Sequence, residues 1–256
     1  MDRKLLKRLL QRMETTGLYF RLKRRTMNKL TYFDSDILLA IAATEYFIKR
    51  AAEAIADKGK FTVALSGGNT PEALYNLLAT DFYSKQVDWK KCYFFWGDER
   101  CVPFTDKNNN SFNAKNILLD KVPVPKKNIF IIPVDESPVN AAIYYEATIK
   151  IFFKTDKPIF DLILLGMGTN GHTASLFPHT TILQETKLLV KEVYVEEVKM
   201  YRISYTVTLI NNAKHILFIV SGSDKKEMLD IVLAGKYDPE KYPAQLIKGA
   251  KWFMNV

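Results

Sequence analysis

The sequence predicts an α/β protein: a single domain whose mostly parallel sheet is flanked by helices in a Rossmann-like arrangement. Short, nearly continuous apolar runs recur along the chain, which is typical of strands buried on both faces. Stretches of helical period separate these runs, and no linker, internal repeat or low-complexity tract interrupts residues 30–256. A length of 256 residues is enough for one such domain with a full core.

The first predicted element is a helix that Ser35 or Asp36 caps and that Gly59 ends. Four apolar runs predict buried strands, and two alternating runs predict two more: Phe61–Leu65, Cys92–Trp96, Phe160–Leu165 and His215–Val220, then Lys187–Glu196 and Met200–Thr208. Further helices are expected near residues 71–79, 110–119, 138–153 and 223–233.

The first 26 residues differ from the rest of the chain in charge. They hold nine basic and two acidic residues, a net charge of +7, which leaves +2 of the total of +9 for residues 27–256. We therefore expect a dispensable basic extension over 1–26, one domain over 27–256, and no nucleic-acid partner, because the basic charge does not cover the domain. The extension is either poorly ordered or an amphipathic helix for a membrane surface or partner, built on Leu5, Leu6, Leu9, Leu10 and Met13.

The sequence shows no pattern of export or membrane insertion. No apolar run reaches the roughly 18 residues that span a bilayer, and the N-terminus lacks the apolar core of a secretory signal. The two cysteines, Cys92 and Cys101, form neither a C-x-x-C pair nor part of a zinc-binding pattern. We expect a cytoplasmic protein with reduced thiols, no metal and no membrane partner, and the oligomeric state stays open.

Ligands of open α/β sheets bind beyond the carboxyl ends of the strands, so the loops there are the candidate sites. The first is Ser66-Gly67-Gly68-Asn69-Thr70-Pro71. Its glycines allow an anion to approach the backbone, Thr70 can cap the next helix, and Pro71 fits its first turn. The loop predicts a phosphate cradle, with a plain strand-to-helix turn as the alternative.

The second candidate loop is the charged triplet Asp98-Glu99-Arg100, which follows the strand Cys92–Trp96. In isolation such a triplet is a surface salt-bridge cluster, because buried unpaired charges are costly. Its expected position beside the first loop favours a binding site.

The third loop contains Gly166, Gly168 and Gly171, which match the dinucleotide pattern G-x-G-x-x-G. We reject dinucleotide binding, because Pro178 would cut short the helix that receives the pyrophosphate. No acidic residue ends a second strand about 20 residues further on, where the ribose contact belongs. The glycines instead predict a tight loop that presents His172 at the edge of the sheet.

The chain has three histidines, and only one of them lies on a glycine-shaped loop. His215 begins an apolar strand and is expected to be structural, whereas His179 follows a proline and is expected at the surface. An imidazole titrates near neutral pH and can act as a general base. His172 is therefore the candidate catalytic residue.

These loops together resemble the 6-phosphogluconolactonases, over about residues 34–256. The family's Ser-Gly-Gly-x-Thr-Pro loop matches Ser66–Pro71, and its Asp-Glu-Arg triplet matches Asp98–Arg100. Its most specific run, Gly-Met-Gly-x-Asp-Gly-His-Thr-Ala-Ser-Leu-Phe-Pro, matches Gly166–Pro178 except at Asn170. Weaker similarities follow at Arg202-Ile203-Ser204, at Asn211-Asn212-Ala213-Lys214, and at Gly222 with Lys225.

The resemblance implies hydrolysis of 6-phospho-D-glucono-1,5-lactone to 6-phospho-D-gluconate, the second step of the oxidative pentose phosphate pathway. A lactone is a reactive ester, so a positioned base suffices and no cofactor is expected. His172 is the expected base, and loop N–H groups around Gly67, Gly68 or Gly168 are expected to stabilise the oxyanion. The expected phosphate ligands are the Ser66–Thr70 loop with Arg100, Arg202 and Lys225, while Asp98 and Glu99 bind sugar hydroxyls or position other groups.

Three positions depart from the family pattern. Asn170 replaces the usual aspartate, and a neutral amide would lower the basicity of His172 if the two are hydrogen-bonded. The amide keeps the shape and a hydrogen-bonding oxygen, so we count Asn170 as catalytic and expect activity to survive. Asn69 and the pair Asn109-Asn110 also differ, without loss of a charged group.

Two other functions stay in play. The glucosamine-6-phosphate deaminase/isomerases share the fold and the Gly-His loop, but theirs continues into Asn-Glu-Pro. Here Leu176–Pro178 holds no carboxylate, and Arg100 stands where those enzymes have tyrosine, which disfavours this alternative. A non-catalytic sugar-phosphate sensor would keep the phosphate loops without the base, so the intact His172 argues against it.

Overall fold

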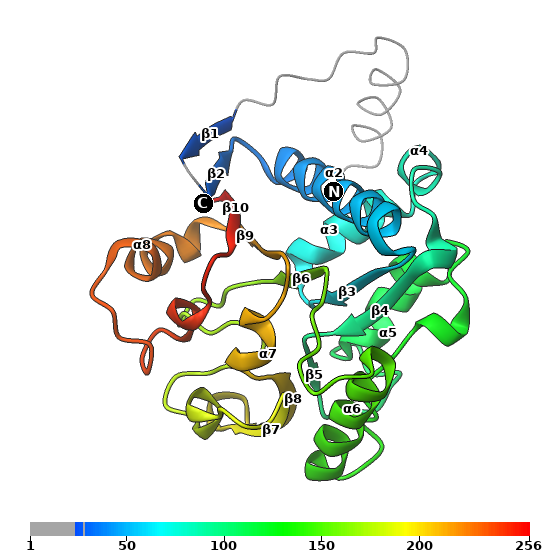
Figure 1. Ribbon diagram of the computed structural model, residues 1–256. Helices are drawn as coiled ribbons and strands as arrows, with labels where there is room; N and C mark the ends of the chain where they lie inside the picture. Colours follow the sequence, from blue (N-terminus) through cyan, green and yellow to red (C-terminus); the bar gives the residue numbers. More distant parts are fainter. Residues whose placement is uncertain (1–23, 28) are drawn as a thin grey trace.

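The computed structural model describes residues 24–27 and 29–256, so the helix considered around Leu5–Met13 lies outside the described residues. Its main element is a seven-stranded sheet of order β1-β2-β10-β9-β6-β3-β4, in which only β1 and β2 pair antiparallel (Figure 1). The strands are β1 Arg24–Met27, β2 Leu30–Phe33, β3 Phe61–Leu65, β4 Cys92–Trp96, β6 Leu162–Leu165, β9 Ile216–Ser221 and β10 Lys251–Asn255. The predicted α/β fold with a mostly parallel sheet is confirmed.

Three strands of this sheet were not predicted. β1, β2 and β10 are short, and β10 is paired on both sides, with β2 and with β9. The two partners of β10 lie far apart in the sequence, so no local pattern marks β10. Because β1 includes Arg24–Met27, the sheet begins three residues before the expected domain start at residue 27.

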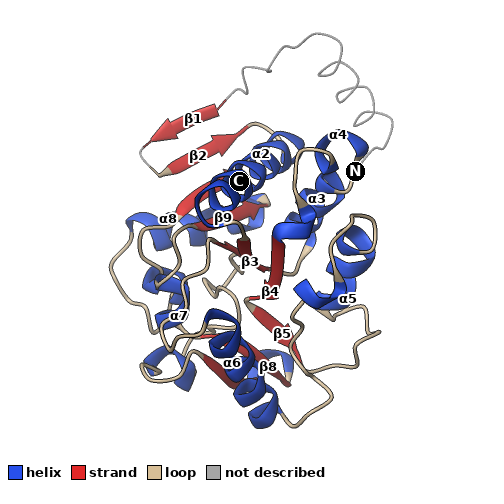
Figure 2. Ribbon diagram, turned by 45° about the vertical axis from the view of Figure 1, so that its right-hand side comes forward, coloured by secondary structure: helices blue, strands red, loops and turns tan. Residues whose placement is uncertain are grey.

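A second, three-stranded antiparallel sheet lies beside the first, with the order β5-β8-β7. Two of its strands, β7 Val190–Val195 and β8 Met200–Tyr205, fall within the predicted strand regions. The third, β5, is the triplet Asp98–Arg100, which we expected as a loop. Figure 2 shows that β5 runs on from β4, so the chain passes directly from the first sheet into the second. The charged triplet is thus fixed in a hydrogen-bonded ladder opposite β8.

The first helix of the described residues, α2 (Asp36–Lys58), has the predicted boundaries. Ser35 Oγ accepts the N–H of Leu38 at 3.4 Å, and Gly59 ends the helix with a φ of 74°. The expected cap at Thr70 is wrong, because α3 (Asn69–Leu78) begins two residues before the predicted start at residue 71, with Gly68 as N-cap at a φ of 99°. The remaining helices are α4 Asp81–Ser84, α5 Asn110–Ala114 followed by a π-helical turn Lys115–Leu119, α6 Pro138–Phe153, α7 Val207–Asn211 and α8 Lys226–Ala234.

The helices lie on both sides of the large sheet. In Figure 1, α2 and α3 lie above it, and the second sheet lies below it with α6 and α7. β3 buries all five of its residues, as a central parallel strand does. Tyr145 of α6 fixes the end of β4, because its hydroxyl accepts the N–H of Trp96 at 2.8 Å. The chain therefore leaves β4 for β5 at a rigid point.

No helix within residues 24–27 and 29–256 is long and apolar enough to cross a membrane.

Candidate active site

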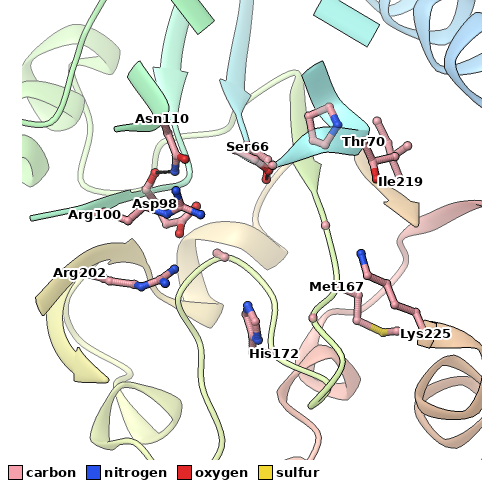
Figure 3. A pocket seen from close by; sticks show the side chains of 16 residues that line it. Ser66, Thr70, Asp98, Arg100, Asn110, Met167, His172, Arg202, Ile219 and Lys225 are labelled. Atoms are coloured by element: carbon pink, nitrogen blue, oxygen red, sulfur yellow. Dashed lines mark hydrogen bonds between the residues drawn. The ribbon is translucent and has the colours of Figure 1, made fainter. Parts of the chain in front are cut away.

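A cavity of about 210 Å³ opens where the chain leaves four parallel strands of the large sheet. The segments after β3, β4, β6 and β9 all contribute to it, and β8 of the second sheet adds a side chain. Figure 3 shows Asp98, Arg100 and Arg202 on one side, Lys225 on the other, and His172 between them, with Ser66 across the cavity. The three loops singled out in the sequence therefore meet in one place.

Most of the predicted site residues line this cavity: Ser66, Gly67, Gly68, Thr70, Asp98, Arg100, Gly168, His172, Arg202 and Lys225. Three do not. Asn69 lines a neighbouring cavity beside the start of α2, Glu99 is fully buried behind the site, and Asn170 lies behind the imidazole.

The imidazole of His172 is held on one edge and on one face. Its Nδ1 lies 2.6 Å from Oδ1 of Asn170, and the same Oδ1 accepts the backbone N–H of His172 at 3.1 Å. The ring stacks on Phe177 at 3.9 Å between centroids and 15° between planes. Because an amide oxygen can only accept, Nδ1 carries the proton, and Nε2 keeps a free lone pair. That is the tautomer a general base needs.

Gly168 is required by this packing. A Cβ on Gly168 would overlap the imidazole of His172, so no side chain fits there. The Gly168 N–H donates to the carbonyl oxygen of His172 at 2.9 Å. Our expectation that it stabilises an oxyanion is therefore wrong, because the donor is already used to close the loop. Gly67 and Gly68 remain candidates for that task.

The pKa of His172 is lowered to about 4. Burial is the largest cause, since it disfavours the charged ring, and the positive charge of Arg202 is the next. Lys225 and Arg100 act in the same direction, while Asp98 opposes them. At neutral pH the ring is therefore uncharged and able to accept a proton.

Arg100 and Arg202 lie directly opposite each other on the antiparallel strands β5 and β8. Like charges in such a pair destabilise a sheet unless a negatively charged group lies near both of them. The Nε atom of each side chain is buried and has no hydrogen-bond partner within the part of the chain that the structure describes. Arg100 Nη1 donates to the carbonyl oxygen of Asn108 at 2.7 Å, and the Arg202 guanidinium lies 5.2 Å from the Phe177 ring centroid. The pair is arranged for an anion.

Asp98 connects the histidine loop to the second sheet. Its Oδ2 accepts the hydroxyl of Ser175 at 2.7 Å, and the N–H of Ser175 donates to Ser204 Oγ at 3.1 Å. Both bonds are buried, so they fix the loop three residues after His172. One oxygen of Asp98 is thus engaged within the protein, while the residue also lines the cavity.

Glu99 points away from the cavity and holds the start of α5. Its Oε1 accepts the N–H groups of Arg100 and Asn110, and its Oε2 accepts the N–H and the hydroxyl of Ser111, all at 2.7–2.9 Å. Burial raises the pKa of this carboxyl, although the four hydrogen bonds oppose that effect. Glu99 therefore positions Asn110 and does not reach a ligand in the cavity.

Asn110 is a lining residue that sequence reasoning missed. Its Nδ2 donates to the carbonyl oxygen of Asp98 at 3.0 Å, and its Oδ1 is buried without a partner among residues 24–27 and 29–256. A Cβ on Gly67 would overlap this amide, which explains why position 67 is a glycine. The Asn109-Asn110 pair is the signal in the sequence, but only the fold places its second member at the site. Pro71, Gly166, Met167, Ala174 and Ile219 also line the cavity.

The other two histidines lie outside the cavity. His215 precedes β9, where its Nε2 lies 3.1 Å from Arg50 Nη1. His179 is exposed, and its Nδ1 lies 3.9 Å from a carboxylate oxygen of Glu240. After β6 the chain forms a loop and no helix before Thr181–Gln184, which agrees with the rejection of a dinucleotide site.

The fold and the site together define a class: α/β proteins that place a histidine and several cations at the carboxyl edge of a parallel sheet, an arrangement that suits a small anionic ligand. The family described as glucosamine-6-phosphate isomerases/6-phosphogluconolactonase matches residues 34–254, and the chain belongs to this family.

Similar proteins point to one branch of this family. A protein of Synechocystis sp. named 6-phosphogluconolactonase is 40% identical over 203 residues, which cover 78% of this chain and 82% of that protein. Another of the same name, from Nostoc sp., is 36% identical over 84% of this chain and 88% of its own length. The crystal structure of 6-phosphogluconolactonase from Thermotoga maritima superposes with a TM-score of 0.77 at 27% identity, over 89% of this chain and 99% of that one.

Proposed function

We propose that this protein hydrolyses 6-phospho-D-glucono-1,5-lactone to 6-phospho-D-gluconate. The observation that carries the proposal is the uncharged, tautomer-fixed imidazole of His172 beside the arginine pair Arg100 and Arg202 in one cavity. A base and an anion site in the same small cavity suit a small substrate that carries both a phosphate and a hydrolysable carbonyl. The names of the similar proteins support the same substrate.

The phosphate carries about −1.5 to −2 charges at neutral pH and needs several donors. Arg100, Arg202 and Lys225 are the cations that we assign to it, together with the loop Ser66–Thr70. The start of α3 adds backbone N–H groups that have no partner within the helix. Asn110 Oδ1, which is buried and has no partner among the described residues, is the acceptor that we assign to a sugar hydroxyl.

Nε2 of His172 takes a proton from a water molecule, whose oxygen attacks the lactone carbonyl carbon. The carbonyl π electrons move to oxygen, and the N–H groups of Gly67 and Gly68 are the donors that we assign to this oxyanion. When the oxyanion collapses, the bond to the ring oxygen breaks. That oxygen takes the proton from the imidazolium, which returns His172 to its starting state and leaves a hydroxy acid that ionises.

Substrate binding itself adjusts the base. The cations Arg202, Lys225 and Arg100 lower the pKa of His172 after burial does. A bound phosphate compensates their charge, so the ring becomes a stronger base when substrate is present. The proton acceptor is thereby strengthened in the enzyme–substrate complex.

We further propose that the substrate is a free metabolite in the cytoplasm. The body of the chain carries a net charge of only +2 over residues 27–256, which gives no electrostatic footprint for nucleic acid. Cys92 and Cys101 are free thiols, as expected in a reducing compartment.

The test is a coupled assay with freshly generated lactone, corrected for spontaneous hydrolysis. We expect turnover by the wild type, and a loss of about 100-fold or more in His172→Gln, because a positioned base contributes about 10²–10⁴. The variant should still bind 6-phosphogluconate. Conversion of glucosamine-6-phosphate in place of the lactone would favour the isomerase branch, and binding without any turnover would favour a sensor.

A further inference from the structure

The side-chain amide of Asn170 lies between His172 and a carboxylate. Its Oδ1 faces the imidazole, and its Nδ2 donates to Oε2 of Glu197 at 2.9 Å. Glu197 belongs to the helical turn Glu196–Val198, which joins β7 to β8 in the second sheet. A residue 27 positions further along the chain thus contacts the partner of the candidate base.

The neighbours of this amide fix its orientation. The backbone N–H of His172 can only donate, and it lies 3.1 Å from Oδ1. A carboxylate such as that of Glu197, whose Oε2 lies 2.9 Å from Nδ2, can only accept hydrogen bonds. A 180° flip of the amide would place its NH₂ group against the N–H of His172 and its oxygen against the carboxylate of Glu197. Only the orientation with Oδ1 toward His172 satisfies both sides.

We propose that Glu197 is a positioning residue for the reaction: it holds the Asn170 amide so that the proton of His172 stays on Nδ1 and the lone pair of Nε2 stays available in the cavity. This inference rests on the proposed role of His172 as base. Glu197 itself does not line the cavity and acts only through Asn170. The other tautomer would carry a proton on Nε2, where it cannot accept one from water.

The same geometry explains how an amide serves at position 170, where the resembling family has aspartate. A carboxylate accepts hydrogen bonds at either oxygen, so it needs no outer partner to orient it. An amide has a donor half, and that half needs an acceptor. In this chain Glu197 supplies the acceptor, so Asn170 and Glu197 form a matched pair.

The first experiment compares Glu197→Gln with Glu196→Gln. Glu196 precedes Glu197 in the same exposed turn and takes no part in the hydrogen bonds of Asn170, so its variant removes the same charge without touching the amide. Because a glutamine can also donate, Glu197→Gln permits the reversed amide. We expect a fall of about 3- to 10-fold in kcat with an unchanged KM, the size of one weakened hydrogen bond, and wild-type kinetics for Glu196→Gln.

A second measurement needs no substrate. The ¹⁵N chemical shifts of the two ring nitrogens of His172 report which one is protonated. We expect a proton on Nδ1 in the wild type and in Glu196→Gln, and a partial shift toward Nε2 in Glu197→Gln. Because this readout is independent of turnover, failure of the positioning role is distinguishable from failure of the lactonase function.

The third experiment places aspartate at position 170. In Asn170→Asp the new carboxylate would face that of Glu197 at the present 2.9 Å contact, and like charges there repel. Adding Glu197→Gln reverses the direction of the hydrogen bond between positions 170 and 197, because the glutamine amide donates to the new carboxylate. The same carboxylate also accepts from Nδ1 of His172. We expect Asn170→Asp to lose activity alone, to regain at least half of that loss with Glu197→Gln, and to regain none with Glu196→Gln.

The proposal is overturned if Glu197→Gln matches Glu196→Gln in both kcat and ring shifts. It is also overturned if Asn170→Asp costs the same in all three backgrounds. Circular dichroism of each variant excludes unfolding as the cause, and Glu197 is exposed, so its substitution leaves the core intact.

Discussion

Replacement of Gly168 by alanine tests how the imidazole of His172 is held. Gly168 is a glycine for reasons of space, because it does not adopt the positive φ of Gly171, which is 79°. A Cβ at position 168 would lie 3.0 Å from Nε2 and would overlap Cε1 and Nδ1. The backbone tolerates alanine there, but the ring must move.

The size of the effect follows from what confines the ring. His172 stacks on Phe177 at 3.9 Å and bonds to Asn170 at 2.6 Å, so a displacement strains at least one of these contacts. A misplacement of about 1 Å in a catalytic group costs on the order of 10²-fold in rate. We expect kcat of Gly168→Ala to fall about 100-fold, while overpacking costs about 1–3 kcal/mol of stability.

The assay is lactone turnover beside a thermal unfolding curve, and the chain offers a matched control. In Gly97→Ala the new methyl group would meet only the carbonyl oxygen of Leu65, at an ordinary 3.7 Å. Gly97 lies outside the cavity lining, so this variant should retain wild-type kcat. If Gly168→Ala keeps a third or more of wild-type kcat, close packing does not position the base and the reasoning fails.

Three further predictions concern charge and chain length. The free-enzyme pKa of His172 is about 4, so the ring stays deprotonated and active as pH falls, until the pH approaches that value. Binding of 6-phosphogluconate should raise the pKa of His172, because the phosphate compensates the charge of Arg202, Lys225 and Arg100. If an NMR titration shows the same pKa with and without 6-phosphogluconate, the phosphate does not bind beside these three cations. Arg202→Lys should weaken inhibition by 6-phosphogluconate about 10-fold, because an ammonium cannot make the two-pronged contact, and equal inhibition by gluconate in the wild type would contradict a phosphate site. A chain that starts at Arg24 should keep its activity and its unfolding midpoint. A chain that starts at Met27 loses most of β1, so it should keep its activity with a midpoint lower by a few degrees. Equal midpoints for the two chains would show that β1 adds nothing to stability.

Local signals account for the parts of the fold that sequence patterns predicted well. The side chain of Ser35 and the left-handed backbone at Gly59 mark the ends of α2, and β3 and β4 have the predicted bounds. Capping, helix termination and unbroken burial act within a few residues, so they leave a signature in the sequence. β10 has no such signature, since its partners β2 and β9 come from opposite ends of the chain.

The residue types that carry chemistry could also be identified from sequence, because glycines and polar groups at strand ends form compact motifs. His172, the Ser66–Thr70 loop and Lys225 meet in the cavity through the parallel order of β3, β6 and β9 alone. Parallel strands bring their carboxyl ends to one edge, so this convergence follows from the fold class.

The direction of each side chain depended on the tertiary structure. Asp98 and Arg100 line the cavity while Glu99 is buried behind it, because side chains on a strand alternate between its two faces and these residues form β5. Side chains in a loop do not alternate in this way, so the prediction of a loop for Asp98–Arg100 gave no indication of which side chains face the cavity. Arg202 reaches the cavity only because β8 pairs with β5, which lies about 100 residues earlier in the chain. Glu197 contacts Asn170, 27 residues before it, only because the turn after β7 lies beside the histidine loop.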